Sequence, residues 1–371
     1  MNLVVLTSSR ADYGIYRPLL KKLEADPFFS MQIIAFGTHV SGFHGYTLTQ
    51  IQEDNFQNIR KVENMVLGDS EEAVSSAMGL TIQKFAGIWA ALREDTDLIL
   101  CLGDRYEMFA AVTAALPYNI PIAHIHGGET SLGAIDNTLR HCLTQMASYH
   151  FVSTEAYAKK VSELTGDTQN IWTCGALSLD NLELLDLMSK EEFLEKFKIN
   201  LNHPSILITF HPETKAGERN REFMEEIFNA FMEIQNYQLV ITMPNADPMG
   251  NMIRAKFEEL KQNHQKVILV ENFGTLGYFS IMKHCSFLLG NTSSGILEAA
   301  SFGKYVINLG ERQKGRACGT NVKSIPITKS AILEAVDTLS PGSKYEEENI
   351  YWKGGDSNKI VQELKGVFAH A

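Results

Sequence analysis

The sequence predicts an α/β protein of two doubly wound, Rossmann-like domains that face a cleft. With 371 residues, the chain is longer than one ordinary hydrophobic core supports, so two domains are expected. Short apolar runs alternate with amphipathic stretches in two successive series, which is typical of parallel sheets covered by helices. Polar residues follow many of the apolar runs, and such sheets bind ligands at the carboxyl ends of their strands.

The first series predicts a domain over residues 1–178. Its apolar runs are expected to form strands at Leu3–Thr7, Gln32–Phe36, Leu98–Leu102, Ile122–Ile125, Phe151–Ser153 and Ile171–Cys174. The amphipathic stretches between them are expected to form helices at Tyr16–Glu24, Glu71–Arg93, Tyr106–Leu116 and Asn137–Ala147.

A charged, helical stretch at residues 180–203 interrupts the pattern and is expected to link the domains. The second series predicts a domain over residues 179–355. Its strands are expected at Ser205–Phe210, Leu239–Met243, Lys266–Val270, Phe287–Leu289 and Tyr305–Leu309, and its helices at Arg221–Gln235, Asn251–Asn263, Gly274–Lys283 and Ser294–Phe302. The amphipathic segment Ser357–Phe368 predicts that residues 356–371 pack back as a helix on the first domain.

Composition restricts the possible functions. The formal net charge of −11 argues against a general surface for nucleic acid or for an anionic membrane. The cysteines are odd in number and form no C-x-x-C pair, which favours reduced thiols at Cys101, Cys142, Cys174, Cys285 and Cys318. No apolar run reaches the roughly 18 residues that a membrane span needs, and no basic region precedes the apolar start, so we expect a cytoplasmic protein.

The segment Gly290-Asn-Thr-Ser-Ser-Gly295 ends a predicted strand and begins a predicted helix. Free N–H groups at a helix start attract phosphate, and Thr292, Ser293 and Ser294 add hydroxyl donors, although a serine-rich helix cap is the simpler interpretation. Glu298, one turn further on, could accept the two hydroxyls of a ribose. The spacing is that of a P-loop without its Lys-Ser/Thr pair, so ATP or GTP hydrolysis is disfavoured.

Basic side chains for an anionic ligand are expected in several loops. The segment Thr7–Gly14 lacks the G-x-G-x-x-G fingerprint, which disfavours a nicotinamide enzyme, and it offers Arg10 to an anion instead. His211 follows a predicted strand and is expected at the cleft mouth, although it could also be an ordinary core histidine. The remaining loop cations, which could clamp phosphate or be merely solvated, are Arg105, Arg312, Lys314 and Arg316.

Several titratable residues of the first domain could perform general acid–base catalysis. Asp104 and Glu129 follow predicted strands, and Asp136 precedes a predicted helix. Simpler roles are a salt bridge for Asp104 and a helix cap for Asp136. His124 and His126 should share one face of their strand and could ligate a metal, but no third ligand has a defined spacing, so we expect no metal.

Taken in chain order, these motifs resemble the hydrolysing UDP-N-acetylglucosamine 2-epimerases of sialic-acid-type sugar biosynthesis. The resemblance covers residues 3–320 and rests on Ser9–Gly14, Gly103–Arg105, His124–Glu129, Ile135–Asp136 with Arg140–His141, His211–Pro212, Pro244–Asp247, Gly290–Gly295 and Asn308–Arg316. It implies the glycosyltransferase-B architecture, in which two Rossmann-like domains border a deep cleft.

The resemblance also implies roles for individual residues. Arg105 would lie beside the reacting end of the substrate, and Asp104 and Asp136 match acid–base positions. Several relatives carry Glu where this chain has His126, so either His126 or Glu129 would take that role. The residues expected to bind UDP are Arg10, His211, Asn245, Thr292, Ser293, Glu298 and Arg312, with Ser294 as a further hydroxyl donor.

The activity that the resemblance implies is the hydrolytic 2-epimerisation of UDP-N-acetylglucosamine. UDP would be eliminated to leave a 2-acetamidoglycal, which water would convert to N-acetylmannosamine. The alternatives are the same reaction on UDP-2,4-diacetamido-2,4,6-trideoxyglucose, a non-hydrolysing epimerase, a glycosyltransferase of the same architecture, or a sugar-nucleotide sensor without activity. No cofactor is needed, and because relatives form dimers or tetramers, a homodimer or homotetramer is expected.

Overall fold

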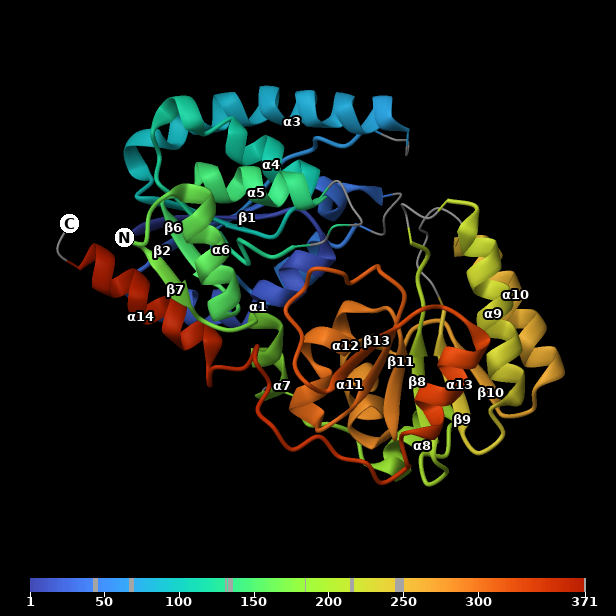
Figure 1. Ribbon diagram of the computed structural model, residues 1–371. Helices are drawn as coiled ribbons and strands as arrows, with labels where there is room; N and C mark the ends of the chain where they lie inside the picture. Colours follow the sequence, from blue (N-terminus) through green and yellow to red (C-terminus); the bar gives the residue numbers. More distant parts are fainter. Residues whose placement is uncertain are drawn as a thin grey trace. The chain divides into compact units, whose positions relative to one another are not determined.

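The computed structural model describes residues 1–42, 46–66, 70–130, 132, 136–183, 185–213, 217–243 and 250–369. The chain divides into two compact units, each built around its own parallel sheet (Figure 1). Unit 1 comprises Met1–Glu129, Ile135–Asn181 and Tyr351–Ala371, and unit 2 comprises Thr130–Ala134 and Leu182–Ile350. The predicted α/β fold of two doubly wound domains is confirmed.

The sheet of unit 1 has the strand order β3-β2-β1-β4-β5-β6-β7, and every pairing is parallel. Its strands are β1 (Asn2–Thr7), β2 (Ser30–Ala35), β3 (Ile59–Lys61), β4 (Leu98–Leu102), β5 (Ile122–Ile125), β6 (Tyr149–Val152) and β7 (Ile171–Thr173). The order along the sheet reverses between β1 and β4. In open parallel sheets, ligands bind beyond the carboxyl ends of the strands near such a reversal.

Helices cover both faces of this sheet, because its strands are apolar on both sides. Alternate residues of β1 enter different cores: Leu3 and Val5 pack with one cluster, and Val4 and Leu6 pack with another. Helices α3, α4 and α5 lie side by side on one face, and α1 packs with α14 on the other (Figure 1). The helices of unit 1 are α1 (Arg10–Ala25), α2 (Leu48–Glu53), α3 (Glu71–Leu92), α4 (Tyr106–Thr113), α5 (Asp136–Met146), α6 (Glu155–Thr165) and α14 (Asp356–Phe368).

Helix α14 is attached to unit 1 by a carboxylate at each end. Asp180 accepts hydrogen bonds from the backbone N–H groups of Asp356 (2.9 Å) and Ser357 (2.7 Å), so it caps the first turn of α14 from another segment. Near the other end, Lys365 Nζ lies 2.7 Å from Asp26 Oδ2, at the end of α1. Between these contacts, the side chains of Ile360 and Leu364 are buried in the core of unit 1.

The sheet of unit 2 has the strand order β10-β9-β8-β11-β12-β13 and is also parallel. Its strands are β8 (Ser205–Thr209), β9 (Gln238–Thr242), β10 (Val267–Val270), β11 (Phe287–Gly290), β12 (Val306–Leu309) and β13 (Val322–Ile325). Its order reverses between β8 and β11. The helices of this unit are α8 (Lys190–Phe197), α9 (Arg219–Glu233), α10 (Gly250–Asn263), α11 (Gly274–His284), α12 (Ser293–Leu297) and α13 (Lys329–Asp337), and a short α7 (Asp180–Glu183) spans the boundary between the units.

The structure corrects several predicted boundaries. Helix α1 begins at Arg10 and not at Tyr16, because Ser9 and Asp12 form a capping box that starts the helix directly after β1. The predicted helix Ser294–Phe302 is instead α12 followed by a 3₁₀ turn at Ala299–Phe302. The elements β3, β13, α2, α6 and α13 were not predicted. Within the described ranges, no helix combines the length and the hydropathy of a membrane span.

Candidate functional site

The carboxyl end of β4 positions two predicted site residues, Asp104 and Arg105. Gly103 follows the strand with a φ of +80°, a conformation that glycine adopts readily, and α4 begins after Arg105. The Arg105 guanidinium donates two hydrogen bonds to the buried carboxylate of Glu107, from Nε at 3.2 Å and from Nη2 at 2.8 Å. Arg105 is therefore paired with Glu107 at the end of the strand.

His126 lies directly after β5 and has a left-handed backbone conformation, with a φ of +62°. Its N–H donates to the carbonyl of Phe151 in β6 (2.9 Å), and its own carbonyl accepts from Arg140 Nη1 (3.2 Å). The strand alternation that predicted a shared face for His124 and His126 ends at Ile125, because the backbone leaves the extended conformation there.

His124 is a buried core histidine. Its Nε2 lies 2.8 Å from the carbonyl oxygen of Gly103, and its Nδ1 lies 3.2 Å from Thr144 Oγ1. Burial is the main cause that lowers its pKa to about 3, so the ring is neutral at physiological pH. Among the described residues, no group of three or more His, Cys, Asp or Glu is arranged to hold a metal ion.

Arg140 of α5 connects the carboxylates of this region and was not assigned a role from the sequence. The side chain of Arg140 is almost fully buried, with 5% of the residue exposed. Its Nη2 forms an ion pair with Asp104, and its Nη1 lies 3.1 Å from Glu129 Oε2. Glu129 is also buried, and its Oε1 accepts from Ser153 Oγ (3.0 Å) and lies 3.6 Å from His126 Nδ1. One guanidinium therefore holds two carboxylates that follow two adjacent strands.

Asp136 is the first residue of α5, one turn before Arg140. Burial raises the pKa of Asp136, and the nearby charge of Asp104 raises it further, while Arg105 and Arg140 act in the opposite direction. Asp136 thus lies in the same charged cluster as Asp104, and the environment favours its protonated form. A carboxyl group whose pKa is raised beside an ion-paired carboxylate is suited to general acid catalysis.

Arg10 is exposed at the start of α1, where a buried network fixes the backbone that precedes it. The Asp12 carboxylate accepts hydrogen bonds from Ser8 N (2.9 Å), Ser9 N (3.0 Å) and Thr7 Oγ1 (2.7 Å). Burial raises the pKa of Asp12, but hydrogen bonds from His39, Thr7 and Ser8 outweigh it and lower the pKa overall. The β1–α1 connection is therefore rigid, and it presents Arg10 beside the first N–H groups of the helix.

In unit 2, the predicted phosphate segment leaves β11 through Gly290. This residue has a φ of +143°, and a Cβ atom there would lie 2.0 Å from the carbonyl oxygen of Thr209 in β8, so only glycine fits. Thr292 caps α12, and its Oγ1 accepts from Ser294 N (3.4 Å). Ser293 begins this helix. The helix-cap interpretation and the phosphate interpretation are both compatible with this geometry.

Asn291 is a second residue that the sequence analysis did not single out. It is fully buried, and its side chain exchanges two hydrogen bonds with the backbone of His211: Oδ1 accepts from His211 N (2.7 Å), and Nδ2 donates to His211 O (2.8 Å). The carbonyl of Asn291 accepts from Arg312 Nη1 (3.2 Å) and Gln313 Nε2 (2.8 Å). Asn291 therefore joins His211 and Arg312 to the start of α12. Its position after a strand-ending glycine was the available signal.

The remaining predicted ligands of unit 2 are placed as follows. Glu298 is buried at the C-terminal end of α12. Lys314 forms an exposed ion pair with Glu311 (2.7 Å), and Arg316 lies nearby in the same loop. Asn245, a predicted ligand of UDP, lies outside the described residues.

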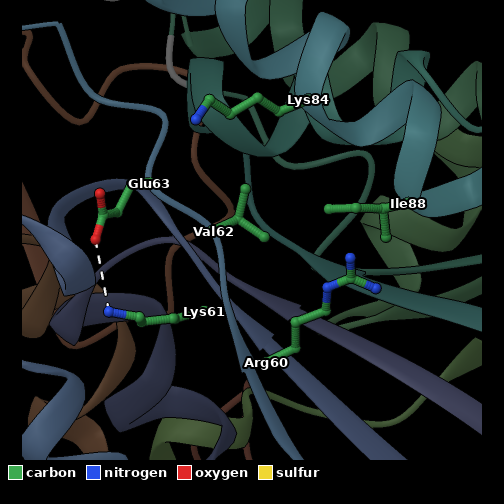
Figure 2. Close-up of a pocket in the computed structure, with 6 residues that line it drawn as sticks. All are labelled: Arg60, Lys61, Val62, Glu63, Lys84 and Ile88. Atoms are coloured by element: carbon green, nitrogen blue, oxygen red, sulfur yellow. Dashed lines mark ion pairs between the residues drawn. The ribbon is translucent and has the colours of Figure 1, made fainter.

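A further pocket lies at the edge of the unit 1 sheet, away from the acid–base cluster. Its volume is about 380 Å³, and it is lined by Arg60, Lys61, Val62, Glu63, Lys84 and Ile88 (Figure 2). Strands β2, β1 and β4 separate β3 from β5. Lys61 is paired with Glu63 (3.5 Å), and exposed charges on an edge strand discourage pairing with other chains.

Known proteins of one family resemble this chain over most of its length. The family model for UDP-N-acetylglucosamine 2-epimerase matches residues 21–365. The chain belongs to the UDP-N-acetylglucosamine 2-epimerase family. The resemblance that the sequence motifs indicated is therefore confirmed.

Two relatives and one solved structure describe the neighbourhood within the family. The chain is 29% identical to the UDP-N,N'-diacetylbacillosamine 2-epimerase (hydrolyzing) of Legionella pneumophila, over 100% of this chain and 97% of that protein. It is 31% identical to the polysialic acid biosynthesis protein P7 of Escherichia coli, over 98% and 93%. It is similar to the crystal structure of UDP-GlcNAc 2-epimerase from Neisseria meningitidis bound to UDP-GlcNAc, with a TM-score of 0.81, 19% identity and 99% and 100% coverage.

Proposed function

We propose that this family member is a hydrolysing 2-epimerase that converts UDP-N-acetylglucosamine and water to N-acetylmannosamine and UDP. The observation that carries the proposal is the cluster around Arg140, in which the buried guanidinium holds Asp104 and Glu129 beside Asp136. An epimerisation at C2 needs groups that remove and return a proton, and this cluster supplies carboxyl groups in different environments.

The proposed first step is an elimination. The C2 hydrogen of the sugar is not next to a carbonyl group, so a base alone would remove it slowly. Departure of UDP from C1, with the electron pair of the C1–O bond, builds positive character on the ring and acidifies C2. As the C2 proton leaves, its bonding electrons form the C1=C2 double bond of a 2-acetamidoglycal.

The proposed second step is a hydration. The C1=C2 electron pair takes a proton at C2 from the opposite face, and water adds its oxygen to C1 and releases one proton to the solvent, which gives the free 2-epimer. Asp136 is the proposed proton donor, because burial and the charge of Asp104 raise its pKa and favour the protonated acid. Asp104, His126 and Glu129 are the remaining candidates for proton transfer.

We propose that unit 2 binds the UDP part of the substrate. Asn291 binds the Arg312 guanidinium through its carbonyl and the His211 backbone through its side chain, and Thr292 caps the helix that follows, so a cation and hydroxyl groups lie near one helix start. Ser293, Ser294 and Glu298 complete the proposed nucleotide site, and Arg10, Arg105 and Asn245 remain proposed ligands of the same substrate. Stabilisation of the leaving diphosphate by preorganised donors would lower the barrier to elimination.

A second candidate substrate is the UDP-linked 2,4-diacetamido-2,4,6-trideoxy sugar. It is favoured by the full-length match to the Legionella protein, whose name specifies UDP-N,N'-diacetylbacillosamine. The chemistry at C1 and C2 is the same for both sugars. The two candidates differ only at C4 and C6, so the proposed acid–base cluster serves either of them.

The test is mass spectrometry of the products from both UDP-sugars, run side by side without any acceptor. A free 2-epimerised sugar and UDP are expected, and in deuterated water one deuterium should appear at C2. Return of an epimerised UDP-sugar would instead identify a non-hydrolysing epimerase, and no deuterium at C2 would exclude the elimination. The Asp104→Asn variant should keep UDP binding and lose turnover.

A further inference from the structure

His126 and Glu129 face one another in the turn that follows β5. His126 Nδ1 lies 3.6 Å from Glu129 Oε1, and both side chains are buried. We propose that the His126 imidazole is the base that takes the C2 proton in the elimination, and that Glu129 is a positioning residue that orients the ring. This inference rests on the proposed function and assigns one of its steps.

The surroundings of Glu129 argue that it holds its neighbours and does not itself accept the proton. Its Oε2 lies 3.1 Å from Arg140 Nη1, and its Oε1 accepts from Ser153 Oγ at 3.0 Å. A general base must reach the proton that it removes, and a carboxylate bound from both sides would have to break these contacts to do so.

The backbone of His126 supports the same assignment. Left-handed conformations cost a residue with a Cβ atom about 1–2 kcal/mol, whereas glycine adopts them readily. The chain nevertheless has histidine at this position, with a φ of +62°, and holds it with hydrogen bonds to Phe151 and Arg140. A role for the imidazole explains why this residue type occupies a conformation that glycine would adopt more easily.

The charged groups around the ring suit a proton acceptor. Glu129 lies against Nδ1 of the ring, and Arg140 of α5 contacts the His126 carbonyl and binds both Glu129 and Asp104. Asp136 and Arg105 belong to the same charged cluster, and His124 of β5 is neutral. A protonated imidazole would place its positive charge directly beside Glu129. A carboxylate on the Nδ1 side also favours the tautomer that carries hydrogen on Nδ1, which leaves the lone pair on Nε2.

In the proposed step, Nε2 takes the C2 proton, the C2–H electrons form the C1=C2 bond, and UDP departs with the C1–O electron pair. The imidazole becomes an imidazolium that faces Glu129. It then returns its proton to solvent, while the hydration step draws its proton from the acid on the other face of the sugar.

Chemical rescue tests the role of His126. His126→Gly suits the left-handed backbone and should fold, which UDP binding by calorimetry would establish. Its kcat should fall by about 100-fold or more, with little change in KM, because a proton-transfer group contributes about 10²–10⁴. Added imidazole should restore part of the rate, and hydration of a synthetic 2-acetamidoglycal should be less affected than elimination. Unchanged kcat in His126→Gly, or no rescue by imidazole, would overturn the assignment.

The Glu129 variants test the positioning role. Glu129→Gln should lower kcat and move the pH limb of the imidazole to lower pH, because loss of the negative charge weakens proton binding. Combined with His126→Gly, it should cost little more than His126→Gly alone, since Glu129 acts through His126. Ser153→Ala, which removes one partner of Glu129, is the milder matched variant. If His126→Gly retains turnover and adding Glu129→Gln to it abolishes turnover, Glu129 is itself the base.

A spectroscopic experiment keeps the inference separate from the proposed function. In ¹⁵N-histidine NMR, the His126 signal, assigned by its absence in His126→Gln, should show the Nδ1–H tautomer at high pH, and Glu129→Gln should change the tautomer balance. This result needs no turnover, so an inactive wild-type protein would refute the proposed function and leave the pair measurable. An identical tautomer in the wild type and in Glu129→Gln would refute the orienting role of Glu129.

Discussion

The strongest prediction on stability concerns the replacement Arg140→Met, which keeps an unbranched side chain and removes the charged guanidinium. The guanidinium is buried between Asp104, whose side chain is 20% exposed, and Glu129, which is 3% exposed. Removal of one partner from a buried ion pair costs about 3–5 kcal/mol, because it leaves an uncompensated charge. Glu129 loses its cation in a dry environment, while Asp104 regains some water. We therefore expect a loss of about 4 kcal/mol in the free energy of unfolding of unit 1.

Tryptophan fluorescence during urea unfolding measures this loss in unit 1 alone. The three tryptophans, Trp89, Trp172 and Trp352, all lie in that unit. With a slope of about 2 kcal/mol/M, the midpoint should fall by roughly 2 M. The penalty should shrink as the pH is lowered, because protonation removes the unpaired negative charge from the interior.

Two companion variants define what would contradict this reasoning. Arg140→Met combined with Glu129→Gln should recover a substantial part of the loss, because the buried charge is then absent. Arg140→Lys keeps the charge but lacks the planar fork that contacts Asp104, Glu129 and the His126 carbonyl together, so it should be intermediate. If the free energy of unfolding of Arg140→Met is within about 1 kcal/mol of the wild-type value at neutral pH, the guanidinium does not stabilise the two buried carboxylates.

Three further predictions follow from other contacts. Asn291→Asp removes the donor to the His211 carbonyl, so the Kd for UDP, measured by calorimetry, should rise by about tenfold. An unchanged Kd would contradict the proposal that Asn291 positions His211 and Arg312 for UDP. Asp136→Asn should lower kcat by about 10²–10⁴-fold. In the wild type, a pH profile of kcat should fall as the pH rises above the raised pKa of Asp136, because the acid then loses the proton that it donates. Asp180→Ala removes the cap of α14, so unit 1 should lose about 1–2 kcal/mol and α14 should exchange its amide hydrogens faster, as read by mass spectrometry.

Most of the fold was predictable because strand and helix periodicities repeat along the chain. The three central-strand runs Leu3–Thr7, Leu98–Leu102 and Ile122–Ile125 are nearly continuous apolar segments, which is the pattern of strands buried on both faces. The edge strand β3 was not predicted, because it has only the three residues Ile-Arg-Lys, of which the two charged ones are exposed. Its place in the sheet comes from its pairing with β2, and no local pattern records that pairing.

The candidate site was predictable to the extent that chemistry follows strand ends. Asp104 and Glu129 were found because each follows an apolar run, and both lie at the cluster that the fold assembles. Arg140 was not assigned, because a single arginine in an amphipathic helix normally points to solvent. Its partner Asp104 is 36 residues away, so only the packing of α5 against the sheet brings the two together.

The attachment of α14 has a consequence for the order in which the protein can be completed during synthesis. Unit 1 contains the first residues of the chain, yet Ile360 and Leu364 belong to its core. Chains usually fold from the N-terminus as they leave the ribosome, but here the core of unit 1 lacks Ile360 and Leu364 until α14 has emerged. Unit 2 has all of its residues earlier, by Ile350. A nascent chain therefore passes through a stage in which the later-encoded unit is complete and the earlier one still exposes the apolar face that α14 will cover.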